Sequence, residues 1–582
     1  MKKIFYLVFA LLFTGCEDFL DTQNYKEKDD SNFPVTEEDA EQMVTGVYST
    51  MATAMRSPSS HFYMVSEQAS EECFGGGGLN DKQAQANDHL LIYDENPYAG
   101  FWSARYTGIN RANNAIAALN NMEDGEVKNQ KLGECYFLRS YFYFELAQMF
   151  EAVPLINKAP SNVVEAQTPP EQATPEELYA HIASDLRKAC EIMPAKKWNE
   201  FSYGTATRWA AEALLARVYL FYTGFYQKDA LPTEEGDDIT KDYVITKLQD
   251  CIDNSGHQLV SDFRSLWAYS NKSTLKDVRS MPEDKRPKWY SDDIQEWKKD
   301  GENPEQIFVF NCHYMDSYPS DGNMTGFANL IAHYSAFRSV SDADYGKDSE
   351  VGAFPLGKGW GYAPVATNFY TDNNWEAKDK RRDYSVMYVD PTKYDGDKQM
   401  EGSGYWQLKN ITISCYNGEN RLASFCSSTD YWGDGVKSDY QSSVAQSLTL
   451  IRYADVLLMQ AELTEDMSYT DDIRRRAGLE PIGYSLEAIQ NERAHELAFE
   501  GVRWMDIRRW HIAESMLQKQ VGTVIYNEGR QVKMNDQKAG YVTRYKETRG
   551  FFAIPKTEID LSNGTMKQNA GWDGDVRFST WE

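Results

Sequence analysis

Residues 131–155 read KLGECYFLRSYFYFELAQMFEAVPL, and this stretch decides the fold class. Apolar side chains recur in it at i, i+3, i+4, i+8 and i+11, as Leu138, Tyr141, Phe142, Leu146 and Met149. Because this spacing follows the turn of an α-helix, it predicts an amphipathic helix over residues 131–150. The proline of Val153-Pro154 cannot continue that helix and marks its end. The stretch therefore indicates a helical scaffold.

Helical patterns continue on both sides of this stretch. A second helix should begin after Thr174, which can cap it, because Pro175 suits the first turn and two glutamates follow. A third helix is expected over residues 205–221, where small residues such as Ala213 permit close packing. Helices paired in this way favour tetratricopeptide-like hairpins. Apolar residues at helical spacing between 494 and 505 predict one further long helix over residues 486–517.

Residues 261–441 have a different character. Gly, Pro, Asp, Tyr and Trp crowd together there, and turn dipeptides such as Asp321-Gly322 recur. This pattern predicts loops and short strands, and long irregular segments are usually functional. We therefore expect a mainly α chain with a helical region over 36–260, an irregular region over 261–441 and a C-terminal helical region over 442–582.

The N-terminal residues are typical of an export signal. Two lysines precede an apolar run over residues 4–13, which closes on Thr14-Gly15-Cys16. The run is about half of the ~20 apolar residues that a membrane-spanning helix needs. Small residues before a cysteine resemble the lipobox of bacterial lipoproteins, so we expect residues 1–15 to be a signal peptide, Cys16 to carry lipid and residues 16–35 to form a tether. An ordinary signal peptide with an incidental cysteine is the alternative.

Composition narrows the classes of partner. The 88 acidic and 60 basic residues give a formal net charge of −28, which disfavours binding to nucleic acid. Apart from Cys16, seven cysteines remain without any CxxC pair, so neither a disulfide framework nor a zinc site is indicated. Cys415 and Cys426 could pair or stay as buried thiols. Aromatic residues make up 13% of the chain, an excess that needs a function or a large core to explain it.

Short segments in order along nearly the whole chain resemble the SusD/RagB family of outer-membrane nutrient-binding lipoproteins. They include CEDFLD at 16–21, IRYADVLL at 451–458, RRRAGL at 474–479 and FEG at 499–501. Cys135 and Glu151-Ala152 depart from the family pattern. The resemblance implies a surface binding protein that needs no cofactor and is not an enzyme. It also implies delivery of an oligosaccharide to a SusC-like TonB-dependent transporter, with a lipid anchor in the outer membrane.

Two other functions stay open at this point. Relatives resembling RagB serve peptide uptake, so a peptide receptor is one alternative. A surface glycoside hydrolase is the other, since such enzymes use two carboxyl groups facing a substrate, and Glu496 and Glu500 are such a pair. Their spacing beside Arg503 on a helix, however, is typical of structural ion pairs. We therefore predict that these carboxylates pair with arginines inside the protein.

Candidate ligand-binding residues combine flat rings with polar neighbours, because sugars present apolar C–H faces and a rim of hydroxyl groups. The family resemblance suggests one rim of the site in the loop over residues 71–88, and the irregular region supplies the rings. The candidates are Phe74, Asn80, Asp81, Lys82, Trp289, Tyr290, Trp297, Tyr314, Trp360 and Tyr362. Core packing is the alternative for each aromatic residue, and a plain loop is the alternative for residues 71–88.

Other motifs argue against catalysis, and one of them is a possible calcium site. The four glycines at 75–78 lack a following Gly-Lys-Ser/Thr, so a phosphate-binding loop is not supported. The histidines show no HExxH motif and no pair at metal-ligand spacing. Alternating acidic residues at Asp342, Asp344 and Asp348 could hold calcium, although the glycine at their centre departs from an EF-hand. The chemistry of these motifs favours a binding protein.

Overall fold

The computed structural model of the 582-residue chain describes residues 36–54, 57–158, 171–312, 328–372, 374–394, 396, 399–416, 422–424, 444, 446–534 and 540–579. The expected signal peptide, Cys16, Tyr314 and Cys426 lie outside these residues. In the part that the structure describes, no helix is long and apolar enough to cross a membrane.

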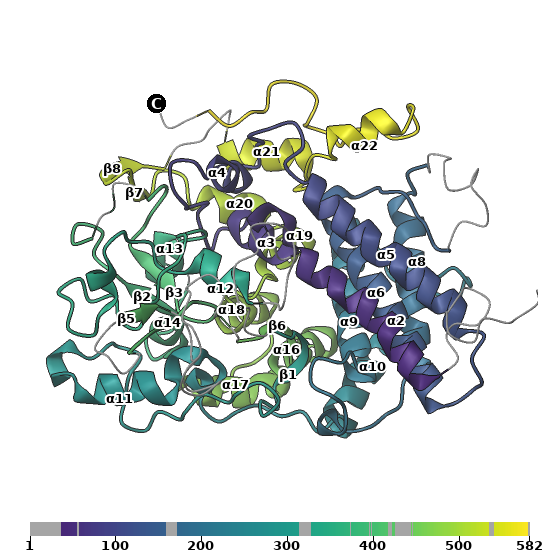
Figure 1. Cartoon of the computed structure of the whole chain (residues 1–582), viewed down its shortest axis with the longest axis horizontal. Helices are drawn as coiled ribbons and strands as arrows, with labels where there is room; N and C mark the ends of the chain where they lie inside the picture. Colours follow the sequence, from purple (N-terminus) through teal and green to yellow (C-terminus); the bar gives the residue numbers. More distant parts are fainter. Residues whose placement is uncertain are drawn as a thin grey trace, which may run out of the picture.

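The N-terminal region is a layered stack of antiparallel helices. Neighbours in space are α2 with α5, α5 with α6, α6 with α8, α8 with α9 and α9 with α10, and the stack forms the right side of the molecule in Figure 1. The helices of the stack are α2 (Glu37–Ala54), α5 (Ala99–Leu119), α6 (Glu126–Phe150), α8 (Pro175–Ile192), α9 (Arg208–Tyr226) and α10 (Lys241–Asn254). Two shorter helices, α3 (Phe62–Ala69) and α4 (Lys82–Asp88), contact each other nearer the middle of the molecule in Figure 1. The mainly helical fold expected from the sequence is confirmed.

Helix α6, the helix expected over 131–150, is buried on almost every side rather than along one stripe. It lies between α5 and α8, so three of its charged residues, Glu134, Arg139 and Glu145, are buried. Arg139 pairs with Asp185 of α8, with Nε to Oδ2 at 2.6 Å, and Arg105 of α5 pairs with Glu145. These pairs explain why a helix with charges all along it can occupy the centre of the stack, because buried charges are tolerated when they are paired.

Helix α8 begins as the sequence predicts. The Thr174 hydroxyl accepts a hydrogen bond from the Glu177 amide, and the Glu177 carboxylate accepts one from the Thr174 amide, which completes a capping box. Pro175 occupies the first turn, where its missing N–H costs nothing. The cap fixes the direction in which α8 leaves the preceding loop.

The irregular region consists of short helices and two-stranded pairs, drawn on the left side of Figure 1. Its elements are α11 (Lys272–Ser280), β1 (Gln306–Phe310), α12 (Leu330–Ser335), α13 (Thr367–Asp372), α14 (Arg381–Ser385), β2 (Val386–Tyr388), β3 (Tyr405–Gln407), β4 (Ser414–Tyr416) and β5 (Leu422–Ser424). Strand β2 pairs with β3 and β4 with β5, both antiparallel. Strand β1 pairs with β6 (Leu448–Arg452), which joins this region to the C-terminal helices.

The C-terminal region returns to helices that pack against the stack through α16 and α19. Its elements after β6 are α16 (Tyr453–Thr464), α17 (Asp471–Ala477), α18 (Leu486–Glu496), α19 (Arg503–Arg509), α20 (Ala513–Gln518), β7 (Val524–Asn527), β8 (Arg530–Lys533), α21 (Gly540–Thr548) and α22 (Lys556–Leu561).

The single long helix predicted over residues 486–517 is wrong, because the structure divides it into α18, α19 and α20. The chain turns at Phe499 and Gly501, whose φ angles are 58° and 73°. The turn points their amides at buried carboxylates of the α3 region: Phe499 donates to Glu72 Oε2 and Gly501 to Glu67 Oε1. A continuous helix would leave these carboxylates without their donors, so hydrogen bonding outweighs the helical spacing of the apolar residues.

The charged residues of the C-terminal helices pair inside the protein, as predicted. Glu496 is fully buried, and its carboxylate forms ion pairs with three arginines. The nitrogen–oxygen distances are 2.8 Å to Arg452, 3.1 Å to Arg381 and 2.6 Å to Arg476. Glu500 pairs with Arg452 and with Lys409, both at 2.7 Å. Burial favours the neutral acid, but the guanidinium groups prevail and hold the pKa of Glu496 well below its usual range. These two carboxylates are therefore structural.

Candidate functional site

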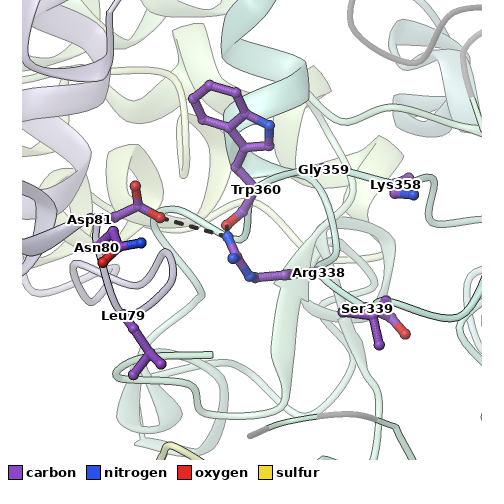
Figure 2. Close-up of a pocket in the computed structure, with 9 residues that line it drawn as sticks. Leu79, Asn80, Asp81, Arg338, Ser339, Lys358, Gly359 and Trp360 are labelled. Atoms are coloured by element: carbon purple, nitrogen blue, oxygen red, sulfur yellow. Dashed lines mark hydrogen bonds and ion pairs between the residues drawn. The ribbon is translucent and has the colours of Figure 1, made fainter. Parts of the chain in front are cut away.

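A pocket of about 550 Å³ opens where the loop before α4 meets the segments after α12. Figure 2 shows its walls. The loop contributes Leu79, Asn80 and Asp81, and the other side is built by residues from two neighbouring segments. These residues are Arg338, Ser339, Val340, Lys358, Gly359 and Trp360. The pocket thus combines one indole ring with an amide, a carboxylate and two cations.

Backbone hydrogen bonds hold the two sides of the pocket together. The Gly77 amide donates to Gly361 at 2.7 Å, and the Ala363 amide donates to Gly75 at 3.1 Å. Gly76, with φ +67°, lies so close to this segment that a Cβ atom would stand 2.3 Å from Cδ of Pro364. Only glycine combines that backbone angle with that approach. The glycine run at 75–78 therefore serves to dock the loop that carries Asn80 and Asp81.

Trp360 is half-buried, and its ring is supported from within the protein. It packs edge-on against His333 at 5.1 Å and at a tilt against Tyr334 at 5.2 Å between ring centroids. Burial and the positive charge of Lys358 lower the pKa of His333 to about 3, so that its ring is neutral at physiological pH. Packing of this kind fixes the orientation of the indole at low cost in side-chain entropy.

Arg338 lies between Asp81 and Trp360 (Figure 2). Its Nη1 donates to the Trp360 carbonyl oxygen at 2.9 Å and stands 3.6 Å from Asp81 Oδ2. The same Asp81 oxygen accepts a hydrogen bond from the Gly78 amide at 2.7 Å. Burial and the charge of Asp81 raise the pKa of the neighbouring Tyr362, whose side chain is buried behind the pocket. The wall thus offers a guanidinium and a carboxylate that are only loosely engaged with each other.

The structure brings together three of the residues named from the sequence, Asn80, Asp81 and Trp360. Tyr362 lies directly behind them, and Lys82 begins α4 with its Nζ 5.5 Å from the Tyr93 ring. Sequence reasoning missed Arg338, Ser339 and Lys358. Lys358 belongs to the same glycine-rich turn as Trp360, which was a usable signal, whereas nothing in the pattern around Arg338 and Ser339 set them apart.

Three other aromatic candidates are covered by protein. Phe74 is buried in the main core, and Trp289 and Trp297 belong to a second core under the irregular region. Trp289 packs at 4.9 Å against Tyr269, so its ring is occupied within the fold. Tyr290 is partly exposed, but its hydroxyl donates to Asp292 and Arg286 lies over its ring at 5.3 Å. None of these four residues lines the pocket.

The remaining sequence predictions find partial answers. Asp344 accepts a hydrogen bond from the Ser339 hydroxyl and Asp348 pairs with Lys347, whereas the side chain of Asp342 lies outside what the structure describes. The calcium prediction therefore stays a prediction. The pairing of Cys415 with Cys426 stays a prediction, because Cys426 and the side chain of Cys415 lie outside what the structure describes. The free cysteines in the described part are all buried, namely Cys73, Cys135, Cys190, Cys251 and Cys312.

Comparison with known families gives two matches that together cover most of the chain. Residues 18–220 match the family model described as "Starch-binding associating with outer membrane", and residues 295–572 match the SusD family model. Among curated proteins, SusD-like protein P2 of Formosa agariphila is 26% identical over 530 residues, which are 87% of this chain and 90% of that protein.

Solved structures share the fold over nearly the whole length. The surface glycan-binding protein A of Bacteroides fluxus has a TM-score of 0.66 and 22% identity, with 93% of this chain and all of that chain covered. A laminarin-binding SusD-like protein has a TM-score of 0.63 and 22% identity, with 92% of this chain and 99% of that chain covered. The surface glycan-binding protein A of Bacteroides thetaiotaomicron, in complex with laminarihexaose, has a TM-score of 0.64 and 17% identity. The match covers 91% of this chain and 99% of that chain.

Proposed function

Because the chain belongs to the SusD family, we propose that it is a surface glycan-binding protein that captures an oligosaccharide in the pocket between Asn80 and Trp360. The observation that carries the proposal is that the Trp360 ring, whose orientation is fixed by packing, and several hydrogen-bonding side chains line the same pocket. A sugar ring can lay its C–H face on the indole while its hydroxyl groups reach Asn80, Asp81 and Arg338. The volume of about 550 Å³ lies within the usual range for small-ligand sites.

The class of glycan to test first comes from the neighbours of similar fold. One is named as laminarin-binding and another was solved with laminarihexaose. Laminarihexaose is therefore the first ligand to test. Because identities of 22% and 17% show a shared fold and not a shared ligand, a wider set of oligosaccharides is tested after it.

Binding without hydrolysis is part of the proposal. Glycoside hydrolases place two carboxyl groups on either side of the scissile bond. Among the described residues that line the pocket, Asp81 is the only carboxylate. Glu496 and Glu500, the other pair considered from the sequence, are occupied by arginine and lysine partners. These positions favour a protein that holds its ligand intact.

The test is isothermal titration of laminarihexaose and a panel of other oligosaccharides into wild type and Trp360→Ala. Loss of one stacking ring should weaken binding by ~1 to 3 kcal/mol, by analogy with stacking on nucleic-acid bases. Tyr388→Ala, which removes a half-exposed ring outside the pocket lining, is the matched control and should bind as wild type does. Equal affinities for all three proteins would place the platform elsewhere, and cleavage of the ligand during incubation would contradict the binding-only role.

Delivery to a SusC-like TonB-dependent transporter and anchoring through Cys16 complete the proposal. The family description, association with the outer membrane, supports the anchoring. Cys16→Ala should release the protein from the outer-membrane fraction, because no described helix could hold it there. Normal retention of the variant in that fraction would contradict lipidation, and co-purification of the wild type with a TonB-dependent transporter is the measurement for the partner.

A further inference from the structure

A second group of functional side chains lies beneath the glycine run, away from the pocket opening. Asp88, His89 and Glu401 each offer one ligand atom, and these atoms all lie within 4.8 Å of one another. Nε2 of His89 is 3.3 Å from Oε1 of Glu401. The relative exposure of these three residues is at most 1%. The group is thus a small constellation of carboxylate and imidazole ligands in the interior.

The charge of this cluster lacks the compensation found elsewhere in the protein. Among the described residues, no lysine or arginine forms an ion pair with Asp88 or Glu401, and His89 is the only ion-pair partner of Glu401. Two carboxylates buried this close together repel each other, and a cation between them would compensate both charges.

One backbone amide holds one oxygen of each carboxylate in the cluster. The Gly75 amide donates to Asp88 Oδ2 and to Glu401 Oε2, both at 3.0 Å. The side chains of Tyr541 and Glu401 also lie against the Asp88 carboxylate. The His89 ring is held by stacking on Tyr541 at 4.6 Å. Donors that hold the outer oxygens of ligating carboxylates are the usual supporting contacts of a metal site.

We propose that Asp88, His89 and Glu401 bind a divalent transition-metal cation, with Zn²⁺ as the best match. One imidazole and two carboxylates supply three ligands of the type that zinc accepts, and a water molecule can complete four-coordination. Calcium fits less well because it takes about six to eight oxygen ligands. A cation here also neutralises the two buried carboxylates without a proton.

This site connects to the pocket through the glycine run. Gly75 begins the run whose end places Asn80 and Asp81, and its amide contacts both carboxylates of the cluster. A Cβ atom at Gly75 would stand 2.5 Å from the Ala84 carbonyl oxygen, so glycine is required for this approach. The cation therefore has a structural role: it fixes the base of the loop that forms one wall of the pocket.

The experiment uses the full chain, purified without a metal-affinity tag in chelator-free buffer. Zinc content is measured by mass spectrometry, and Zn²⁺, Mn²⁺ and Ca²⁺ are titrated calorimetrically into chelator-treated protein. We expect one zinc per chain, a lower melting temperature after chelation, and recovery on adding Zn²⁺. Asp88→Asn and Glu401→Gln should each weaken zinc binding at least about tenfold. Glu72→Gln, a buried carboxylate outside the cluster, is the matched control and should bind zinc as wild type does.

Two results would overturn the proposal. Equal zinc binding by wild type, Asp88→Asn and Glu401→Gln would show an adventitious ion only. Failure of wild type to bind Zn²⁺ or Mn²⁺, with a higher melting temperature for Asp88→Asn, would show that the two carboxylates share a proton instead. Because the wild-type titration and chelation are decisive by themselves, poor folding of a variant does not leave the question open.

Discussion

Two arginine–carboxylate pairs in this protein differ in their surroundings. Arg452 and Glu496 meet at 2.8 Å with side chains that are 2% and 0% exposed. Arg338 and Asp81 stand 3.6 Å apart with side chains that are 28% and 26% exposed. The first pair belongs to a closed network in the helical core, and the second lies in the wall of an open pocket.

The difference separates structural charges from charges that can serve a ligand. Among the described residues, the ion-pair partners of the Glu496 carboxylate are three arginines held by the fold, so a ligand would have to displace a buried guanidinium. Arg338, by contrast, has five N–H donors, and one of them donates to the Trp360 carbonyl oxygen. A partly solvated group with spare donors can exchange water for sugar hydroxyls at modest cost.

Breaking the buried pair should have the largest effect. Glu496→Gln removes the negative charge that faces Arg381, Arg452 and Arg476, which leaves buried guanidinium groups without full compensation. We expect the free energy of unfolding to fall by about 3 to 5 kcal/mol, measured by urea unfolding.

The control for this change lies on the same helix. Glu487→Gln removes an exposed carboxylate at the start of α18 and should alter stability by no more than about 0.5 kcal/mol. A Glu496→Gln protein that unfolds like wild type but loses ligand would move this glutamate from the structural network to the binding site.

Glu67 sharpens the comparison, because it is a buried carboxylate that forms no ion pair with an arginine among the described residues. Glu67 accepts hydrogen bonds from the Gly501 amide and the Cys73 thiol, but burial prevails and raises its pKa from about 4.5 to about 7. The native state therefore binds a proton between these pH values that the unfolded state has released. The stability that this group contributes is complete below pH 4.5 and is lost as the pH rises through 7, by up to about 3 kcal/mol.

Glu67→Gln cannot titrate, so it should lose this part of the pH dependence. The measurement is the free energy of unfolding at pH 5 and pH 8: the decrease seen in wild type should be smaller in Glu67→Gln and unchanged in Glu487→Gln. Identical pH dependence in all three proteins would mean that Glu67 is ionised in the native state.

Much of the fold could be predicted because local signals agreed with tertiary structure. The cap at Thr174 and the apolar spacing in α6 gave the correct helices. The break at Phe499 and Gly501 could not be predicted, since its cause is a pair of carboxylates about 430 residues away in the chain. Helical periodicity reports which residues are buried, and it does not report which amides a distant side chain needs.

The pocket was predictable only in part. Asn80 and Asp81 could be named because the family resemblance places one rim of the site in their loop, and Trp360 could be named because it lies in a glycine-rich turn. Trp289 and Trp297 carry the same local signal, yet they build a second core beneath the loops. Arg338 becomes a candidate only when the hydrogen bonds of residues 357–363 bring two segments together. Long-range pairing, which sequence spacing does not encode, decides between platform and core.

The smallest expected change in stability comes from the open pair, and it tests the comparison directly. Arg338→Met keeps much of the side-chain length but removes the guanidinium, and an exposed pair contributes only ~0 to 1 kcal/mol to folding. Ligand affinity should fall by more, about 1.5 kcal/mol or above, because hydrogen bonds from a charged donor are lost. Arg475→Met, which removes an exposed cation on α17 far from the pocket lining, should change neither quantity appreciably. Urea unfolding and calorimetric titration of the three proteins separate the two effects. Destabilisation of Arg338→Met as large as that of Glu496→Gln would show that the open pair is structural after all.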